Sequence, residues 1–285
     1  MSISTPDTDR SYGDEPPTPV HADAPGLPES LRLRREESIA VLTLSRAAKR
    51  NALDDVTIAG LESFFATPPS WAAVVVLDAE GEHFSAGLDL NELTERDSWA
   101  GLEHSLGWHR AFQKIESGRL PVVSVLKGAV IGGGLELAAA THLRVAEPSA
   151  YYALPEGQRG LFVGGGASVR VPRLIGVHRM MDLMLTGRVL DAREGQDLGL
   201  THYLAEPGQG LDLALDLARR IAGNAPATNF AVLHALPLIA EAAPAQGYLM
   251  ESLMAAVASS SEEAKRRMQA FLDGRAAKVS HGGAE

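Results

Sequence analysis

The sequence predicts an α/β protein in which strands and helices alternate, followed by a helical C-terminal region. Short β-branched or alternating apolar runs are separated by segments with helical spacing, which is typical of βαβ units. After Gly166 the sequence becomes helical. The chain has 285 residues, 45% of them hydrophobic and 22% charged, so it can bury a sizeable core. No internal repeat of fixed period is present.

The N-terminal half is predicted as strands and helices in turn. Residues 31–45 alternate and then become apolar, which indicates a hairpin or two short strands. Helical spacing in residues 51–67, ended by two prolines, predicts a helix. The β-branched run in residues 71–81 predicts a strand buried on both faces, feeding a loop. A second helix is expected from Trp99 to Ser117.

The second half begins with strand signals and then becomes helical. Residues 120–133 predict a strand, a turn and a second apolar segment, after which a helix begins. Residues 143–156 predict two further short strands. The remaining helices are expected at residues 167–187, 191–200, 208–224 and from about Pro226 onward. This last region is expected to pack on the α/β core.

The first 28 residues differ from the rest. They hold six prolines, five acidic residues and a single aromatic residue, so they cannot bury enough apolar surface to offset their ordering entropy. We therefore expect a disordered tail at 1–28, a core domain at 29–225 and a helical region at 226–285. The tail is too acidic for a transit peptide and lacks the apolar core of a signal peptide, which predicts a cytoplasmic protein.

Charge and composition exclude several classes of function. The net charge is −10, which disfavours broad attraction to nucleic acid or to an anionic membrane. No apolar run is long enough to span a bilayer. The chain has no cysteine, so disulfides, thiolate chemistry and cysteine-bound metals are excluded. The histidines show no metal-ligand spacing, and residues 261–271 are typical of a capped amphipathic helix.

The strongest candidate site is the run "KGAVIGGGLELAAATHLRVAE", residues 127–147. Three consecutive glycines, 132–134, stand between a strand and a helix, where they either serve tight packing or let a ligand approach free backbone N–H groups. Glu136 lies three residues after Gly133, on the same helix face. A backbone donor and a carboxyl group would then share one volume, and apolar neighbours would raise the pKa of that carboxyl.

Two other stretches complete the candidate site. Residues 81–93, "GEHFSAGLDLNEL", supply a second glycine-flanked backbone segment and thus a possible second oxyanion donor. Glu156 follows Pro155 at the end of an apolar segment, with Gly164–Gly166 shortly after it. Alone it would be a solvated loop residue. As a partner for Glu136 it could divide acid and base roles, provided that the two environments separate their pKa values.

Together these stretches resemble the enoyl-CoA hydratase/isomerase, or crotonase, superfamily. The resemblance rests on the combination of "SRAAKRNALD", "FSAGLDL", "GAVIGGGLELA", "ALPEGQRGLFVGGGASVRVPRLIG" and "SEEAKRRMQAFLDGR". It covers the chain from about Leu31 to Lys278. It implies a spiral of repeated ββα units with a helical C-terminal region, assembled as homotrimers that often pair into hexamers.

The resemblance also implies roles for particular residues. The backbone N–H groups of Leu88 and Gly133 would form the oxyanion hole for the thioester carbonyl of an acyl-CoA. Glu136 and Glu156 match the two glutamates that hold the water in hydratases. The residues implied in substrate and CoA binding are Lys49, Ala86, Asp89, Leu90 and Gly164. No metal or redox cofactor is implied, since CoA arrives with the substrate.

The reaction implied is syn addition of water to a trans-2-enoyl-CoA. The rivals are enoyl-CoA isomerisation, which typically needs one carboxylate, other crotonase chemistry (dehydratase, lyase or hydrolase), and a non-catalytic acyl-CoA or RNA binder. Two retained glutamates favour hydration. The chain departs from common hydratases at Asn91, where many carry lysine, and at "FVGGGASV" (162–169), which replaces Ile-Pro-Gly-Ala-Gly-Gly-Thr-Gln. The second change is expected to alter acyl specificity.

Overall fold

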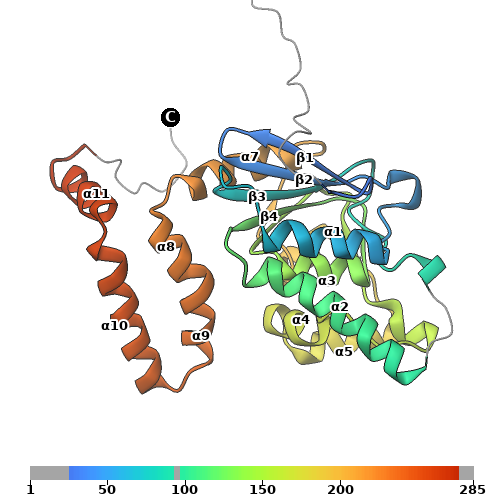
Figure 1. Cartoon of the computed structure of the whole chain (residues 1–285). Helices are drawn as coiled ribbons and strands as arrows, with labels where there is room; N and C mark the ends of the chain where they lie inside the picture. Colours follow the sequence, from blue (N-terminus) through green and yellow to red (C-terminus); the bar gives the residue numbers. More distant parts are fainter. Residues whose placement is uncertain (1–25, 93–96, 276–285) are drawn as a thin grey trace, which may run out of the picture.

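The computed structural model describes residues 26–92 and 97–275 (Figure 1). Most of the predicted tail, 1–28, lies outside the described residues, as do the last ten residues of the region 226–285. Residues 26–28 are described and precede the first strand. Leu27 packs against the hydrophobic core there, so this residue of the predicted tail belongs with the core.

The larger sheet has six strands in the order β1-β2-β3-β4-β6-β9. Strands β1 and β2 form an antiparallel hairpin, the first of the two predicted alternatives, with Leu31 opposite Leu44. Every following pair is parallel, as expected for strands joined through helices. The strands are β1 Leu31–Glu36, β2 Ile39–Leu44, β3 Val74–Ala79, β4 Val122–Leu126, β6 Leu143–Ala146 and β9 Tyr203–Leu204.

A smaller sheet lies beside it, in the order β5-β7-β8. Its strands are β5 Ala129–Ile131, β7 Tyr151–Ala153 and β8 Leu190–Asp191, with β5 and β7 parallel and β8 antiparallel to β7. Strand β5 leads directly into a helix, and β7 leads directly into a 3-10 helix. Because β5 and β7 run in parallel, the segments that follow them leave the sheet at the same edge.

Helices cover both faces of the larger sheet (Figure 1). Helices α1, α2 and α3 lie on one face and α7 on the other. The α-helices of the core are α1 Asp55–Ala66, α2 Ser98–Glu116, α3 Gly133–Ala140, α4 Ala167–Ile175, α5 Val177–Thr186, α6 Ala192–Leu198 and α7 Gly210–Ala222. Short 3-10 helices are η1 Ala47–Lys49, η2 Leu90–Glu92 and η3 Pro155–Arg159.

Strand β3 shows why the chain needs helices on both faces. Its residues alternate between two apolar clusters: Val75 and Leu77 join the core beneath α1 to α3, whereas Val74 and Val76 pack towards α7. All four are fully buried. A continuous β-branched run of this kind is stable only when both faces of the sheet are covered, so the predicted α/β architecture is confirmed.

The C-terminal helices form an arm that stands beside the core (Figure 1). It contains α8 Pro226–Phe230, a π-helical turn η4 Ala231–Ala235, α9 Leu236–Glu241, α10 Pro244–Ser260 and α11 Glu262–Leu272. The helical content was predicted, and the Ser261 side chain caps α11 by accepting a hydrogen bond from Ala264 N–H. The arm meets the core through an ion pair from Arg173 on α4 to Glu241 and a hydrogen bond from Arg267 Nη1 to Gly223 O, whereas α10 stands apart from it (Figure 1). The predicted packing of the whole region on the core stays a prediction.

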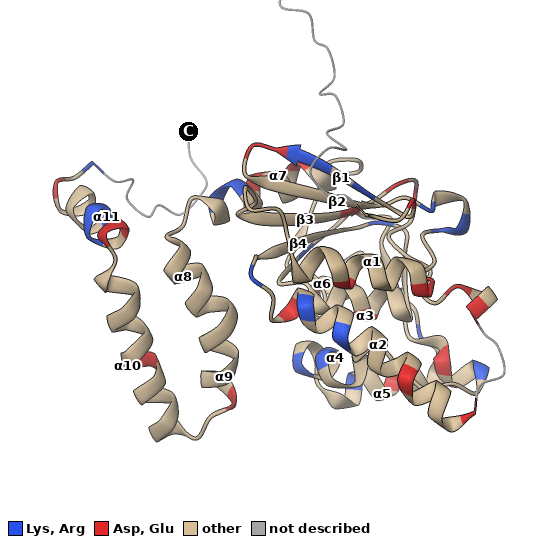
Figure 2. Cartoon of the chain, viewed as in Figure 1, with Lys and Arg blue, Asp and Glu red and all other residues tan. Residues whose placement is uncertain are grey.

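The exposed surface of the arm is apolar. Figure 2 shows that α8, α9 and α10 carry almost no charged residues. The exposed large apolar residues there are Phe230, Val232, Leu236, Leu238, Tyr248, Leu249, Leu253 and Val257. Contiguous exposed apolar surface of this kind marks an interaction site. No helix in the described part of the chain has the length and apolarity to cross a membrane.

Candidate active site

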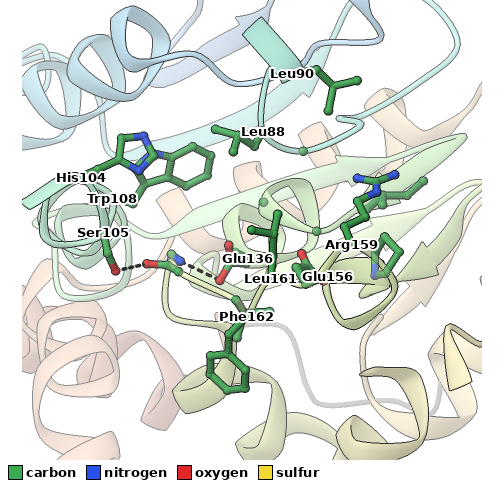
Figure 3. Close-up of a pocket in the computed structure, with 18 of the residues that line it drawn as sticks. Leu88, Leu90, His104, Ser105, Trp108, Glu136, Glu156, Arg159, Leu161 and Phe162 are labelled. Atoms are coloured by element: carbon green, nitrogen blue, oxygen red, sulfur yellow. Dashed lines mark hydrogen bonds between the residues drawn. The ribbon is translucent and has the colours of Figure 1, made fainter. Parts of the chain in front are cut away.

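A cavity of about 410 Å³ lies between α2, the β5–α3 turn, η3 and the loop that precedes α4 (Figure 3). Both candidate carboxyl groups, both candidate backbone donors and the first two glycines of the triglycine segment line it. The lining residues are Ala86, Gly87, Leu88, Leu90, Gly101, His104, Ser105, Trp108, Ile131–Gly133, Glu136, Pro155, Glu156, Arg159 and Leu161–Gly165. Segments far apart in the sequence therefore meet in one place.

Gly132 forms the turn that brings α3 into the cavity. Its backbone has φ 52° and ψ −120°, a conformation that favours glycine, and its N–H donates to Ala153 O of the neighbouring strand β7. Gly133 then begins α3, so its N–H has no partner within the helix. The strand-to-helix transition predicted from the sequence is confirmed.

Glu136 lies on the first turn of α3 and is 4% exposed. Its Oε1 accepts two backbone hydrogen bonds, from Gly165 N–H at 2.8 Å and from Ala167 N–H at 3.0 Å. These donors belong to the loop before α4 and to the first residue of that helix. Burial raises the pKa of Glu136, while the two N–H donors and the charge of Arg170 act in the opposite direction.

Glu156 reaches the same cavity from η3. Its carboxyl group lies against Gly132, so close that a Cβ on Gly132 would be 2.7 Å from Glu156 Oε1. Glu156 Oε2 is buried and has no hydrogen-bond partner among the described residues. Burial raises the pKa of Glu156 to about 6, with a further contribution from the charge of Glu136, whereas Arg159 lowers it. The two carboxyl groups therefore face one another across the space where a small molecule would bind.

Two backbone N–H groups face the same space. A Cβ on Gly133 would lie 3.4 Å from Leu88 N, which places the two amides side by side. Neither N–H donates a hydrogen bond within residues 26–92 and 97–275. Buried amides without a partner are rare, so this pair is available to an oxygen atom of a ligand. Such an oxygen would gain more stabilisation as it became an anion.

The loop that carries Leu88 is held from outside the cavity. Asp89 is buried and pairs with Arg46 at 2.7 Å and with Lys49 at 3.0 Å. A hydrogen bond from Asn91 N–H and those from Arg46 and Lys49 lower the pKa of Asp89 to about 2. Asp89 and Lys49 do not line the cavity. Asp89 instead fixes the loop, and the half-exposed Lys49 pairs with Asp89 outside the cavity.

Ala86, Leu90 and Gly164 line the cavity, and their contact with a substrate stays a prediction. The carbonyl group of Gly164 accepts a hydrogen bond of 2.6 Å from Ser105 Oγ. The N–H that holds Glu136 belongs to the next residue, Gly165.

One wall of the cavity was missed by sequence reasoning. It is the face of α2 formed by Gly101, His104, Ser105 and Trp108, which recur at the spacing of a single helix face. His104 Nε2 donates a hydrogen bond to Asp55 Oδ1, 3.0 Å away. Trp108 is 4% exposed, and its Nε1 has no partner in the described part of the chain. The spacing was visible in the sequence, but it reads as an ordinary amphipathic helix.

The Trp108 ring also packs against the glycines of the site. A Cβ on Gly133 would lie 2.7 Å from Trp108 Cζ3, and one on Gly165 would lie 3.0 Å from Trp108 Cε3. Glycine at these positions therefore leaves room for the ring as well as for a ligand. Among the described histidines and acids, no three side chains converge in a way that could hold a metal ion.

Comparison with known proteins gives a consistent result. The family model for enoyl-CoA hydratase/isomerase matches residues 34–281. The chain is 30% identical to the enoyl-CoA hydratase EchA19 of Mycobacterium tuberculosis, over 87% of this chain and 95% of the relative. It is 29% identical to the 2,3-dehydroadipyl-CoA hydratase of Escherichia coli K12, over 86% and 96% of the two chains.

A solved structure resembles it more strongly. The crystal structure of a candidate enoyl-CoA hydratase from Rhodopseudomonas palustris CGA009 superposes with a TM-score of 0.84 and 58% sequence identity. The match covers 86% of this chain and 95% of that one. The spiral α/β fold with a helical C-terminal part, expected from the sequence motifs, is confirmed.

Proposed function

Because the chain belongs to the enoyl-CoA hydratase/isomerase family, we propose that it hydrates trans-2-enoyl-CoA thioesters by syn addition of water. The observation that carries the proposal is the pair of carboxyl groups, Glu136 and Glu156, facing two free backbone N–H groups in one cavity. Isomerisation within this family typically needs one carboxylate. Two carboxylates that line the same cavity favour hydration.

The two amides are suited to the thioester carbonyl. As water attacks C3, negative charge develops on that oxygen, and the N–H groups of Leu88 and Gly133 stabilise the resulting enolate. Leu88 is fixed by the backbone bonds from Leu53 N–H to Gly87 O and from Asp89 N–H to Leu53 O, each 2.8 Å. Donors held in this way need no reorganisation during the reaction.

The two carboxyl groups divide the proton transfers. Glu136, with two N–H donors and Arg170 nearby, is the group whose ionised form is better supported, so it accepts a proton from the water as the oxygen bonds to C3. Burial raises the pKa of Glu156 to about 6, and its Oε2 has no partner among the described residues, so it donates a proton to C2. Transfer of a proton from Glu136 to Glu156 then returns both carboxyl groups to their starting states.

We propose no further cofactor: CoA enters as part of the substrate, and every step uses groups of this chain. Ala86 and Leu90 lie at the edge of the cavity next to the oxyanion donors, where the pantetheine and adenine would leave. Lys49, whose side chain is 47% exposed, supplies a positive charge behind that edge for the phosphates. Its pairing with Asp89 keeps it near the loop.

We also propose that the protein assembles as a homotrimer, with pairing into hexamers as a further step. The support is the exposed apolar surface of α8 to α10 described above, which carries almost no charge and is unsuited to contact with water alone. Sedimentation velocity analysis over a range of protein concentrations tests the assembly. A monomer at all concentrations would contradict it.

The experiment that tests the activity follows the absorbance of the conjugated thioester in crotonyl-CoA and in a longer trans-2-enoyl-CoA. Wild type is compared with Glu136→Gln and Glu156→Gln. Loss of absorbance in wild type, and a drop of about 10²- to 10⁴-fold in each variant, is expected for general acid and base residues. If wild type left both substrates unchanged but moved a Δ3 double bond to Δ2, the activity would be isomerisation.

A further inference from the structure

The loop before α4 contains three consecutive glycines, Gly164–Gly166, and no proline. Glycine restricts the backbone less than any other residue does, so this segment has high conformational freedom. Yet this loop supplies the N–H groups that hold Glu136. Something other than the loop's own sequence must therefore fix the orientation of its peptide groups.

Two side chains do so, each through one peptide unit. Ser105 Oγ donates to Gly164 O at 2.6 Å, and the N–H of that same peptide is Gly165 N–H, which donates to Glu136 at 2.8 Å (Figure 3). Arg170 Nη1 donates to Gly165 O at 3.0 Å, and the N–H of that peptide belongs to Gly166, which also favours the ionised form of Glu136. The C=O and N–H of one peptide group point in opposite directions. A carbonyl held away from Glu136 therefore directs the N–H of the same peptide towards Glu136.

Arg170 is itself held in place. It is 8% exposed, lies on α4, and its Nε donates to Glu116 Oε2 at 2.8 Å at the end of α2. Ser105 lies on the same helix α2. Helix α2 therefore braces the loop at two points, directly through Ser105 and indirectly through Glu116 and Arg170.

From these contacts we propose that Ser105 and Arg170 are positioning residues that keep two glycine peptides oriented towards Glu136, and so keep Glu136 ionised and correctly placed as the base. The proposal rests on the hydration chemistry proposed above. Without the brace a glycine peptide can flip, which would present a carbonyl oxygen to the carboxylate in place of an N–H. Repulsion between the two oxygens would then favour protonation of Glu136 or its movement out of place.

The chain offers matched variants. Ser105→Ala removes one brace and Arg170→Gln the other, whereas Ser105→Thr keeps the hydroxyl group. Arg173→Gln is the control, because Arg173 lies one turn along the same helix, is exposed, pairs with Glu241 on the arm and does not line the cavity. It removes the same charge from α4 without touching the loop.

We expect Ser105→Ala and Arg170→Gln to lower kcat by about 10- to 100-fold, the scale of a misplaced catalytic group. The KM for the enoyl-CoA should change by less than about threefold, since the oxyanion donors remain in place. Ser105→Thr should recover most of kcat, and Arg173→Gln should match wild type. Equal loss in Arg173→Gln, or unchanged kcat in both brace variants, would overturn the proposal.

The pH profile separates positioning from loss of structure. The acidic limb of kcat/KM, where the base must be ionised, should move to higher pH in both brace variants. The other charged or titratable groups lining the cavity are Glu156, His104 and Arg159, and none belongs to the loop. If the variants lost activity with an unmoved acidic limb, the proposal would be wrong.

A second readout does not depend on turnover. Carbon-13 NMR of the glutamate carboxyl groups, with the Glu136 signal assigned by its absence in Glu136→Gln, measures the titration of Glu136 directly. We expect its midpoint to rise in Ser105→Ala and in Arg170→Gln, and not in Arg173→Gln. If wild type hydrated no enoyl-CoA, the proposed activity would fail, while this titration would still decide the positioning role. Because Ser105→Ala removes one hydroxyl group, it provides the test even if Arg170→Gln does not fold.

Discussion

Helix α3 and the 3-10 helix η3 each supply one carboxyl group to the cavity, but they support it differently. Glu136 on α3 is almost fully buried, and its Oε1 accepts two backbone hydrogen bonds. Glu156 on η3 is half-buried, and its Oε2 has no partner among the described residues. One group is fixed by its surroundings and the other is left free to exchange a proton.

One fold can therefore give its two carboxyl groups separate acid and base roles. The two side chains are chemically identical and close enough that the charge of one raises the pKa of the other. Glu136 has two backbone donors and the charge of Arg170, whereas Glu156 has a hydrogen bond from its own backbone N–H and a buried Oε2 without a partner among the described residues. This difference removes the symmetry. The difference between the two carboxyl groups can be tested by substitution and by pH, and shortening the side chains is expected to have the largest effect.

Shortening each carboxyl side chain tests which group needs fixed geometry. Glu136→Asp draws the carboxylate away from donors at 2.8 and 3.0 Å, so we expect kcat to fall by about 100-fold or more. Glu156→Asp has no such contacts at Oε2 and should lose about tenfold. Steady-state hydration assays measure both. A larger loss in Glu156→Asp would reverse the comparison.

The close contact between Gly133 and the Trp108 ring gives the next largest expected effect. In Gly133→Ala the new Cβ would meet the Trp108 ring at 2.7 Å, and that ring is buried, so overpacking should cost about 1–3 kcal/mol. Adding Trp108→Leu removes the ring atoms concerned. Urea unfolding of both single variants and the double variant measures the coupling. Simple additivity of the two single effects would show that the contact is not the cause.

The pH dependence of kcat/KM should report the free carboxyl group. Glu156 must be protonated to act as the acid, and burial raises its pKa to about 6. We therefore expect kcat/KM to fall as pH rises through about 6, and that alkaline limb to vanish from the residual activity of Glu156→Gln. A limb unchanged in the variant would assign the proton to another group.

The smallest effect is on stability. Folding disfavours ionised Glu156, so the penalty is absent below the ordinary pKa of 4.5 and fully present above about 6. Glu156→Gln should then be more stable than wild type at pH 7 by about 1 kcal/mol after allowance for solvent screening, and no more stable at pH 4. Chemical denaturation at the two pH values measures this. Equal gains at both would point to packing instead of charge.

Much of the site could be predicted because its parts have local signatures. The turn at Gly132–Gly134 and the carboxyl group of Glu136 lie within one strand-to-helix transition, so their proximity follows from helix geometry alone. The hairpin of β1 and β2 and the buried strand β3 likewise follow from apolar patterns. In each case the deciding interactions are close in sequence or set by periodicity.

Other parts depend on contacts between distant segments. Ser105 lies 59 residues from the carbonyl group that it holds, and Arg170 lies 54 residues from Glu116. No local pattern distinguishes such residues from ordinary helix positions. The two-residue strands β8 and β9 also escaped prediction, because runs this short carry no periodicity. Asp89 was placed near the substrate by motif alone, whereas its burial with Arg46 makes it a support of the loop.

The apolar arm of helices α8 to α10 has a consequence for how the protein behaves on dilution. If copies of the chain cover that surface, as proposed, part of the free energy that maintains the folded arm comes from association and scales with the logarithm of concentration. The thermal midpoint should then rise with the amount of protein in the cell, while the core, with its own buried sheet, should respond less. A higher concentration of the protein would then itself stabilise the folded arm.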